Sequence, residues 1–349
     1  MMETNILNHN DSLLKESYDI SNTHLFFIIG RSRSGTTLLQ TMLDANPNLS
    51  VAPECLFIMN LYNKYKYCKW NRNKVLDFYN DLWLEKRLKT WDLNKEKLRR
   101  DLLALESRSN FRDYCKVVFK NYAELHGSEE AIIFGDLNHH YCLFVKELAS
   151  VFPDAKFVHI VRDFRDNVLS HTKLTFESNN SSILAYRWKK YNKEVLKISH
   201  FLENRILRIR YEDLVIEPEK ELMRVCTFLG VDFHSSMLEH YKNKRSSFSD
   251  PWQPNIKKPI NRNRLYAWKK EMSKTDVLKC EYICKDIAQL FGYEVTTAGT
   301  SVKLYISTLP GVLYGWLRTM SEKILFLFSF PVRLRARVIT FSRKINKSF

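Results

Sequence analysis

The feature that most constrains the fold is a strand–loop–helix segment near the N-terminus. An apolar run at 26–29 leads into the loop Gly30-Arg-Ser-Arg-Ser-Gly35, and a helix follows from about Thr36. Two glycines separated by four residues have the spacing of a phosphate-binding P-loop. Small residues let backbone amides converge on anionic oxygens, and the helix N-terminus adds partial positive charge. The segment therefore predicts a nucleotide-binding loop, the alternative being a structural turn between strand and helix.

The charges of this loop narrow the type of ligand. Thr36 stands where a nucleotide triphosphatase carries its lysine, which argues against ordinary ATP or GTP hydrolysis. Arg31 and Arg33 supply charge from the same turn, and a guanidinium group suits a bidentate grip on phosphate or sulfate. The loop is therefore expected to hold an anionic group through arginine and threonine.

A second strand also ends in basic and hydroxyl side chains. The run 157–161 looks like a buried strand, Arg162 follows at its carboxyl end, and Ser170 lies about two helical turns downstream. Open α/β sheets bind ligands at the carboxyl ends of their strands. Arg162 and Ser170 can meet one phosphate only if the helix folds back beside the strand end. The alternative is a salt-bridged strand exit.

These two segments together carry a family resemblance. Arg-Ser-Gly-Thr-Thr at 33–37 and Val-Arg-Asp-x-Arg-Asp-x-x-x-Ser at 161–170 resemble the two cofactor motifs of sulfotransferases that use 3′-phosphoadenosine 5′-phosphosulfate (PAPS). Similarity continues in order through Ala-Pro-Glu54, Arg210-Tyr-Glu-Asp-Leu-Val, Phe228-Leu-Gly230, Lys258-Pro-Ile-Asn, Trp268 and Phe291-Gly-Tyr293. The resemblance covers roughly residues 24–295 and is nearest to the group of bacterial and protein-tyrosine sulfotransferases.

The resemblance implies a role for each matching residue. The 5′-phosphosulfate loop would consist of Arg33, Ser34, Gly35, Thr36 and Thr37. Arg162 and Ser170 would hold the 3′-phosphate, and Tyr211 and Lys258 would contact the nucleotide. Glu54 matches the general base, so the reaction would move a sulfuryl group from PAPS to a hydroxyl or amine of an acceptor, most simply a saccharide or lipid-linked glycan. This scheme requires no metal, because cationic side chains do the neutralising.

One position departs from the family pattern. Leu137 stands where relatives carry a catalytic lysine, and a leucine cannot stabilise developing charge on the leaving phosphate. The substitute is either another cation, Lys258 or Arg31, or one of the neighbouring histidines, His139 and His140; otherwise transfer is weak or absent. A missing electrostatic donor costs about 100- to 1,000-fold in rate. A further serine donor is expected from Ser246, Ser247 or Ser249.

The rest of the chain fits one α/β domain. The fold class predicted is a P-loop nucleotide-binding fold, with a central parallel sheet flanked by helices, in which 26–30, 132–135, 157–161 and 206–209 are strands buried on both faces. We expect an N-terminal extension at 1–23, the main domain at 24–295, a helical insertion at 56–130 over the mouth of the site, and a C-terminal tail at 296–349. Further expectations are a helix from Pro218 to its stop at Gly230, a loop across the site at 246–265, and a helix at 273–290 capped by Ser273.

The C-terminal tail is basic and amphipathic. The chain has 55 Lys or Arg against 39 Asp or Glu, a net charge of +16. Nine Lys or Arg and one Glu lie in 301–349, so half of the excess is in this tail. Basic residues beside Trp, Phe and Leu suit an anionic membrane surface, the alternative being a helix docked on its own domain. Nucleic acid is not expected as a partner because no recognised binding motif accompanies the charge.

Compartment and function class follow from the remaining features. Seven cysteines form no CxxC pair, no secretory signal opens the chain, and no apolar run reaches the roughly 20 residues of a spanning helix. We expect a cytoplasmic enzyme of prokaryotic type, peripheral at the inner membrane face. Alternatives to a sulfotransferase are a nucleotide kinase with an unusual P-loop and a degenerate, non-catalytic nucleotide-binding protein at the membrane surface.

Overall fold

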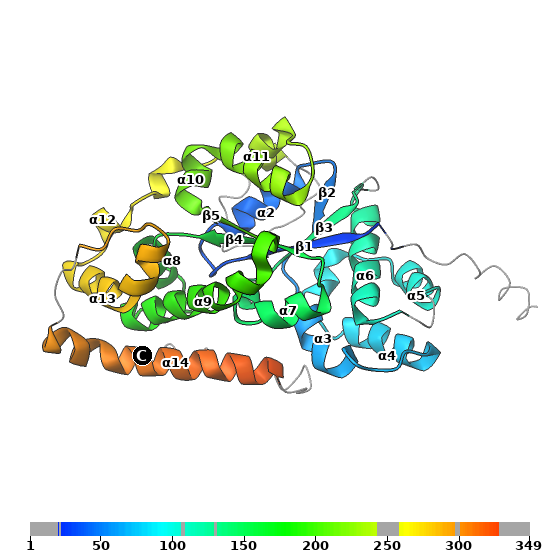
Figure 1. The fold of residues 1–349 in the computed structure, drawn as a ribbon, viewed down its shortest axis with the longest axis horizontal. Helices are drawn as coiled ribbons and strands as arrows, with labels where there is room; N and C mark the ends of the chain where they lie inside the picture. The colour runs from blue at the N-terminus through cyan, green and yellow to red at the C-terminus, as the bar shows by residue number, and fades with distance from the viewer. Residues whose placement is uncertain are drawn as a thin grey trace, which may run out of the picture.

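A five-stranded parallel sheet forms the centre of the molecule in the computed structural model (Figure 1). The strands are β1 (His24–Ile29), β2 (Leu49–Val51), β3 (Ile133–Leu137), β4 (Lys156–Val161) and β5 (Ile206–Arg210), in the order β2-β3-β1-β4-β5. The structure describes residues 20, 22–105, 109–128, 131–242, 258–296 and 301–327. The predicted fold class is confirmed, and β1 and β4 lie side by side, so the loops that follow them meet at one edge.

Four of the five strands were expected from their apolar runs, and β2 was not. β2 has only three residues, too short for a periodic pattern to be distinguished from a loop. It pairs with β3 over Leu49 to Val51 and carries the chain back toward the strand ends immediately before Glu54. β2 therefore determines where Glu54 enters the site.

Helices cover both faces of the sheet (Figure 1). One face holds α2 (Thr36–Asp44), α10 (Tyr211–Ile216) and α11 (Pro218–Leu229), and the other holds α7 (Val145–Val151), α8 (Phe164–Thr172), α9 (Ser181–Leu202) and α13 (Lys274–Leu290). Side chains of β1 alternate between two hydrophobic clusters, with Phe26 and Ile28 in one and Phe27 and Ile29 in the other. Because successive residues of a strand face opposite sides, burial on both faces fits the continuous apolar run.

Short helices connect the larger elements. Between β2 and β3 lie α3 (Phe57–Tyr65), α4 (Arg72–Leu82), the 3-10 turn η2 (Leu88–Trp91), α5 (Lys95–Leu103) and α6 (Phe111–Leu125). Further turns and helices are η3 (His139–Leu143), η4 (Glu203–Arg205), η5 (Ser235–Lys242), η6 (Arg262–Arg264) and α12 (Trp268–Glu271). The α3–α6 segment is the predicted helical insertion, and Trp70, Tyr114 and Phe78 pack within it as an aromatic cluster.

The predicted helix ends are confirmed. Helix α11 begins at Pro218 and ends before Gly230, which has a left-handed φ of 88°. Ser273 caps α13 and accepts a hydrogen bond from the Asp276 amide at 3.1 Å. Glycine at a left-handed C-cap and serine at an N-cap are both favoured by local backbone energetics.

A long C-terminal helix, α14 (Val302–Leu327), lies along α9 on the side away from the sheet (Figure 1). Gly311 and Gly315 face α9, and a Cβ added at Gly311 would lie 2.6 Å from Ser182 Cβ. Ion pairs strengthen the contact, since Arg318 binds both carboxylate oxygens of Glu177 and Glu322 lies 2.6 Å from an Arg187 nitrogen. The described part of the tail is thus docked on its own domain, and the basic stretch 328–349 lies outside the described residues.

The close approach of α14 to α9 makes a testable prediction. Gly311→Leu should lower the free energy of unfolding by about 1–3 kcal/mol, because added side-chain atoms overlap the backbone and Cβ of α9. Ser307→Leu introduces the same side chain at an exposed position of α14 and should be nearly neutral. Urea unfolding of the two variants measures the difference. Equal stabilities would contradict the tight packing of α14 on α9.

Candidate active site

The P-loop has two residues with a positive φ, a glycine whose type explains it and an arginine whose type does not. Gly35 has a φ of 91° and precedes α2, and a Cβ there would lie 2.3 Å from the Tyr211 ring. Gly30 is similarly confined, since an added Cβ would lie 2.5 Å from the carbonyl oxygen of Ile160. Arg33 has a φ of 68°, a strained conformation for a non-glycine residue that is concentrated at functional sites. The loop is therefore held tightly against β4 and α10.

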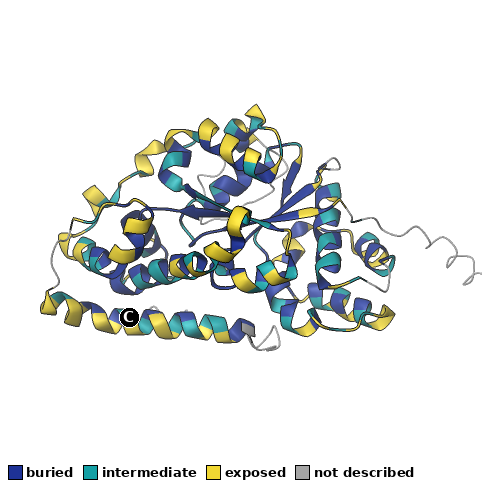
Figure 2. Cartoon of the chain, in the orientation of Figure 1, coloured by how far each residue is buried: buried dark blue, intermediate teal, exposed yellow. Residues whose placement is uncertain are grey.

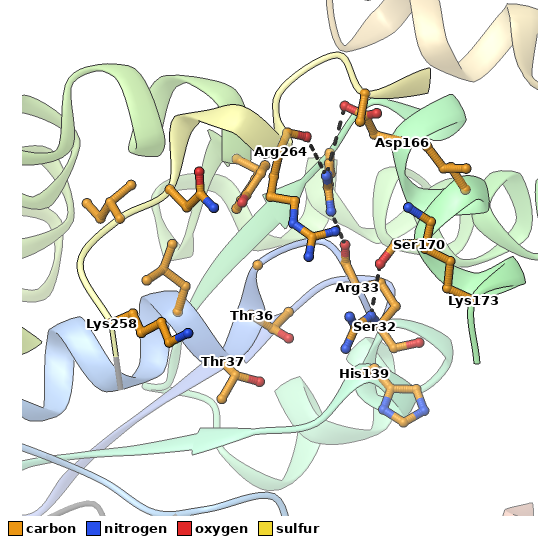
Figure 3. A pocket seen from close by; sticks show the side chains of 18 of the residues that line it. Ser32, Arg33, Thr36, Thr37, His139, Asp166, Ser170, Lys173, Lys258 and Arg264 are labelled. Carbon is orange, nitrogen blue, oxygen red and sulfur yellow. Dashed lines mark hydrogen bonds and ion pairs between the residues drawn. The ribbon is translucent and has the colours of Figure 1, made fainter. Parts of the chain in front are cut away.

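A cleft of about 230 Å³ opens beside this loop (Figure 3). Of the nine residues predicted to bind the cofactor, eight line the cleft, and so does Glu54, the predicted general base. Those that do are Arg33, Gly35, Thr36, Thr37, Glu54, Arg162, Ser170, Tyr211 and Lys258. Segments more than 200 residues apart in sequence are thus brought to one place.

Ser34 is the predicted residue that does not line the cleft. Its side chain is buried, and its hydroxyl lies 3.0 Å from Asn167 Nδ2. Asn167 also donates to the carbonyl oxygen of Ser32 at 2.8 Å, so it ties the P-loop to α8. The structural role of Asn167 was missed because a lone Asn in a helical pattern gives no sequence signal.

Arg33 and Ser170 meet across the cleft. Arg33 Nε donates to Ser170 Oγ at 3.1 Å (Figure 3). Arg162 and Ser170 both line the cleft, so the condition for these two residues to contact one phosphate is met. A guanidinium and a hydroxyl can bind neighbouring oxygens of such a group.

Arg162 joins three segments of the site. Its Nη1 donates to the Arg33 carbonyl at 3.2 Å, and its Nη2 donates to the Arg264 carbonyl at 3.0 Å. Its guanidinium carbon lies 4.6 Å from the centre of the Tyr211 ring, and Asp166 lies 3.9 Å from Nη2. Arg162 therefore fixes the walls of the cleft and brings positive charge to them.

The alternative interpretation of the second motif, a salt-bridged strand exit, applies to Arg165. Arg165 is buried, binds Asp163 at 2.8 Å and Glu281 at 2.9 Å, and stacks 3.8 Å from the centre of the Trp268 ring. These contacts connect α8 to α13 and α12. Arg162 faces the cleft while Arg165 is structural.

Glu54 is hydrogen-bonded to His139 in the lining of the cleft. Glu54 Oε1 lies 2.9 Å from His139 Nδ1, and Glu54 Oε2 lies 3.5 Å from Arg87. Burial alone would raise the pKa of Glu54, but the charge and hydrogen bond of His139, together with Arg87, outweigh it and lower the pKa to about 2. Glu54 is therefore a carboxylate at neutral pH, and His139 Nδ1 is its hydrogen-bond partner.

The structure shows which of the four residues proposed to replace the family lysine line the cleft. Leu137 ends β3, is buried and lines the cleft, so its position is at the site and its side chain is apolar. Arg31 does not line the cleft, because it lies 4.8 Å from the centre of the Tyr191 ring in the interior. His140 packs between His139 and Phe326, and burial lowers its pKa to about 3. Lys258 and His139 are the two named candidates that line the cleft.

The loop across the cleft and the end of α8 supply basic residues, two of which were not predicted. The described part of the predicted 246–265 loop begins at Lys258, whose side chain points toward Thr36 and Thr37 (Figure 3). Arg264 and Lys173 also line the cleft and were missed because neither falls in a recognised motif. Asp166 accepts the Tyr266 and Trp268 amides at 2.8 and 2.9 Å, which anchors the loop to α8. Ser246, Ser247 and Ser249 lie outside the described residues.

The helical insertion is placed differently from expectation. We expected it over the mouth of the site, but no residue of α3 to α6 is among those lining the cleft in the described structure. The insertion contacts the Glu54 segment through η2 and the residue before it. Arg87 pairs with Glu54, and Trp91 Nε1 donates to the Pro53 carbonyl at 3.1 Å. The insertion thus positions the Glu54 segment.

Three side chains, two in the lining of the cleft and one behind it, have the composition of a metal site. One ligand atom each of Glu54, His139 and His140 lies within 4.8 Å of the others. Two imidazoles and a carboxylate are suitable zinc ligands. The same atoms are engaged in the Glu54–His139 pair and the stacked imidazoles, so the group also has a full explanation without an ion.

Comparison with known proteins identifies the family. The model of the sulfotransferase family matches residues 26–235. The chain belongs to the sulfotransferase family. It is accordingly a transferase enzyme, and the match contains both segments whose loops form the cleft.

Relatives and solved structures agree with this membership. A putative protein-tyrosine sulfotransferase of Caenorhabditis briggsae is 21% identical over 290 residues, covering 80% of this chain and 93% of that protein. Protein-tyrosine sulfotransferase 1 of Danio rerio is 26% identical over 255 residues, and the match spans 70% of this chain and 65% of that protein. The sulfotransferase domain of the Synechococcus PCC 7002 olefin synthase has a TM-score of 0.60 at 23% identity, covering 80% and 98% of the two chains.

A buried acid beside Leu137 makes a prediction on pH. Burial raises the pKa of Asp136 to about 8, and Tyr141 donates to it at 2.5 Å. Since the unfolded chain releases this proton near pH 4 and the folded chain near pH 8, this residue's contribution to stability falls as pH rises through that window. Asp136→Asn should therefore stabilise the protein on the order of 2 kcal/mol at pH 8, with the gain shrinking toward pH 4.

Thermal unfolding across pH 4 to 9 measures this difference. Asp154→Asn, at an exposed carboxylate in a long ion pair with Arg112, is the matched control and should show little dependence. A loss of stability in Asp136→Asn at pH 8 would show that Asp136 is ionised in the folded protein.

Proposed function

We propose that this protein transfers the sulfuryl group of PAPS to an acceptor hydroxyl. The observation that carries the proposal is the arrangement of one cleft, which has an anion-binding loop with Arg33 and Ser170 at one wall and the Glu54–His139 pair in its lining. Family membership supplies the sulfuryl chemistry. The cleft supplies separate places for an anionic donor and for proton removal from an acceptor.

The residues of the cleft fit a nucleotide with two phosphate positions. Thr36 and Thr37 at the start of α2 would hold the 5′-phosphosulfate with Arg33, in the positive field of the helix N-terminus. Arg162 and Ser170 would hold the 3′-phosphate. Arg162 Nε is buried without a partner among the described residues, which leaves a donor for a bound anion. PAPS carries the sulfuryl group on its 5′-phosphate.

The reaction balances without a metal. The acceptor oxygen forms a bond to sulfur as the bond from sulfur to the 5′-phosphate oxygen breaks, and 3′-phosphoadenosine 5′-phosphate (PAP) leaves. The acceptor proton passes to the Glu54–His139 pair, in which a carboxylate bound to Nδ1 orients the imidazole and leaves Nε2 as its other nitrogen. Lys258 would then neutralise the leaving phosphate in place of the family lysine, because its side chain points toward Thr36 and Thr37.

The acceptor is proposed at the level of a hydroxyl. Lys173, Lys258 and Arg264 give the cleft a basic lining, which favours an acceptor that is itself acidic or carries anionic groups. Saccharide and lipid-linked glycan hydroxyls remain our prediction. A tyrosine hydroxyl in a peptide is the second candidate, because the relatives reported above are named protein-tyrosine sulfotransferases.

Transfer of radiolabelled sulfate from PAPS tests the proposal. The full chain is incubated with labelled PAPS and a panel of anionic saccharides, lipid-linked glycans and tyrosine peptides with acidic neighbours. Label on at least one acceptor class is the expected result and also decides between the two candidates. Tight PAP binding with no label on any acceptor would instead favour the degenerate, non-catalytic alternative.

Two variants separate binding from chemistry. Glu54→Gln should lower kcat about 100-fold or more with PAP affinity unchanged, because it removes the charge that accepts or supports the proton. His139→Gln should lower kcat similarly if the pair acts as a unit. Glu294→Gln changes an exposed carboxylate away from the cleft and should be neutral. Full activity in Glu54→Gln would contradict the assignment of the base.

A further inference from the structure

The outer face of α14 is the largest concentration of exposed apolar side chains in the described chain. Of the 18 large hydrophobic residues that are exposed, eight lie on this one helix. They include Tyr305, Ile306, Leu309, Leu313, Trp316 and Leu317, and their spacing of three, four and seven residues places them on one face. Figure 2 shows exposed residues along the length of α14. Contiguous patches of this kind mark interaction sites.

Over most of its length, α14 directs its large apolar side chains outward, the reverse of an ordinary surface helix. In a soluble domain the large apolar side chains face the core and the polar ones face water. Here the buried positions over most of the helix are Thr308, Gly311, Gly315 and Thr319, and large apolar residues are buried only at its end, at Leu325 and Phe326. Leu313, Trp316 and Leu317 are 53%, 46% and 57% exposed. Small residues at a helix contact with large apolar residues facing outward are typical of helices whose surroundings are lipid.

Polar contacts hold α14 in this orientation. Arg318 binds Glu177 at 2.9 and 3.0 Å, Lys323 binds Glu194 at 2.5 Å, and Glu322 accepts from Tyr191 at 2.8 Å. Rotating the helix to bury its apolar face would break all of these pairs and remove the glycines from α9. The exposed face is therefore fixed outward by the fold.

Charge decides between a lipid surface and a second protein copy. Residues 328–349, which continue directly from α14, contain six Lys or Arg and no Asp or Glu. A twofold dimer through this face would pair the surface with a second copy of the same chain, whose net charge is +16, so the positive residues would meet no excess of negative charge. An anionic lipid surface attracts them instead. Tyr305 and Trp316 have the amphipathic rings favoured at the boundary between headgroups and acyl chains.

We propose that the outer face of α14 binds an anionic lipid bilayer surface, with the helix lying in the plane of the interface. None of the helices within the described residues is long and apolar enough to cross a membrane, which agrees with a surface position. The proposal is independent of sulfuryl transfer, since it rests on α14 and the charge that follows it.

Vesicle co-sedimentation of the full chain tests the proposal. Binding to vesicles of phosphatidylcholine mixed with phosphatidylglycerol should exceed binding to phosphatidylcholine alone by about tenfold or more, and salt should weaken it. The triple variant Leu313→Ser, Trp316→Ser, Leu317→Ser should lose about tenfold or more of the affinity. The control variant Tyr67→Ser, Phe201→Ser, Leu290→Ser removes three apolar residues elsewhere that are even more exposed, and it should bind as the wild type does.

Two further measurements exclude a folding artefact and the other occupant. Trp316→Phe keeps the apolar area, so it should bind vesicles normally but lose most of the quenching of tryptophan fluorescence by brominated lipids. Sedimentation velocity without lipid should show the same species for wild type and the Leu313/Trp316/Leu317 variant. No vesicle binding, equal binding by that variant, equal loss in the control, or a wild-type dimer that the variant abolishes would each overturn the proposal.

Discussion

The buried guanidinium of Arg162 is the contact on which the cleft depends. It lies at the carboxyl end of β4 and donates to the carbonyl oxygens of Arg33 and Arg264, so it joins the P-loop to the loop that crosses the site. The Tyr211 ring packs on its face. Charged donors to carbonyls in a low-dielectric setting are strong and geometrically specific. One cation therefore joins two loops, and its Nε has no hydrogen-bond partner among the described residues.

The end of β3, where the family pattern has a lysine, is apolar in this protein. Leu137 makes the end of β3 apolar, and the neighbouring Asp136 has its pKa raised by burial, so this strand end carries little charge at neutral pH. Positive charge in the lining comes instead from Lys258 and Arg264 of the crossing loop and from Lys173 at the end of α8. In the proposed reaction, stabilisation of the leaving phosphate would therefore come from Lys258 in the crossing loop.

The end of helix α14 contacts the residues that surround the Glu54–His139 pair. Phe326 near its end lies 5.7 Å from His140 between ring centres, and His140 lies 3.9 Å from His139. His139 in turn binds Glu54. A segment outside the sulfotransferase match thus contacts the Glu54–His139 pair through a continuous series of ring contacts. Deleting the tail would therefore disturb the site as well as the outer face.

Sequence alone predicted the parts of this molecule that local patterns determine. The strands β1, β3, β4 and β5, the P-loop and the caps at Pro218 and Ser273 all follow from residues adjacent in the chain. The sequence could not show that Arg31 packs inward on Tyr191 while Arg33 lines the cleft. The orientation of these side chains depends on the loop backbone, in which Arg33 has a positive φ that its residue type does not predict.

Long-range placement was equally hidden from the sequence. The pairing of Glu54 with His139 joins residues 85 positions apart, and the position of the α3–α6 segment beside the cleft depends on packing against the sheet. The outward face of α14 depends on which side meets α9, and a helical period alone is compatible with either orientation.

Titration of PAP against the purified protein tests the central claim most directly. The titration is run in the presence of EDTA, with magnesium-ATP as competitor in a second series and with Arg33→Met beside the wild type. Our account predicts tight PAP binding without metal, weak competition by ATP, and at least about tenfold weaker binding in Arg33→Met, since it loses a charged contact to phosphate. Absence of PAP binding, or preference for magnesium-ATP, would contradict the account and favour a kinase.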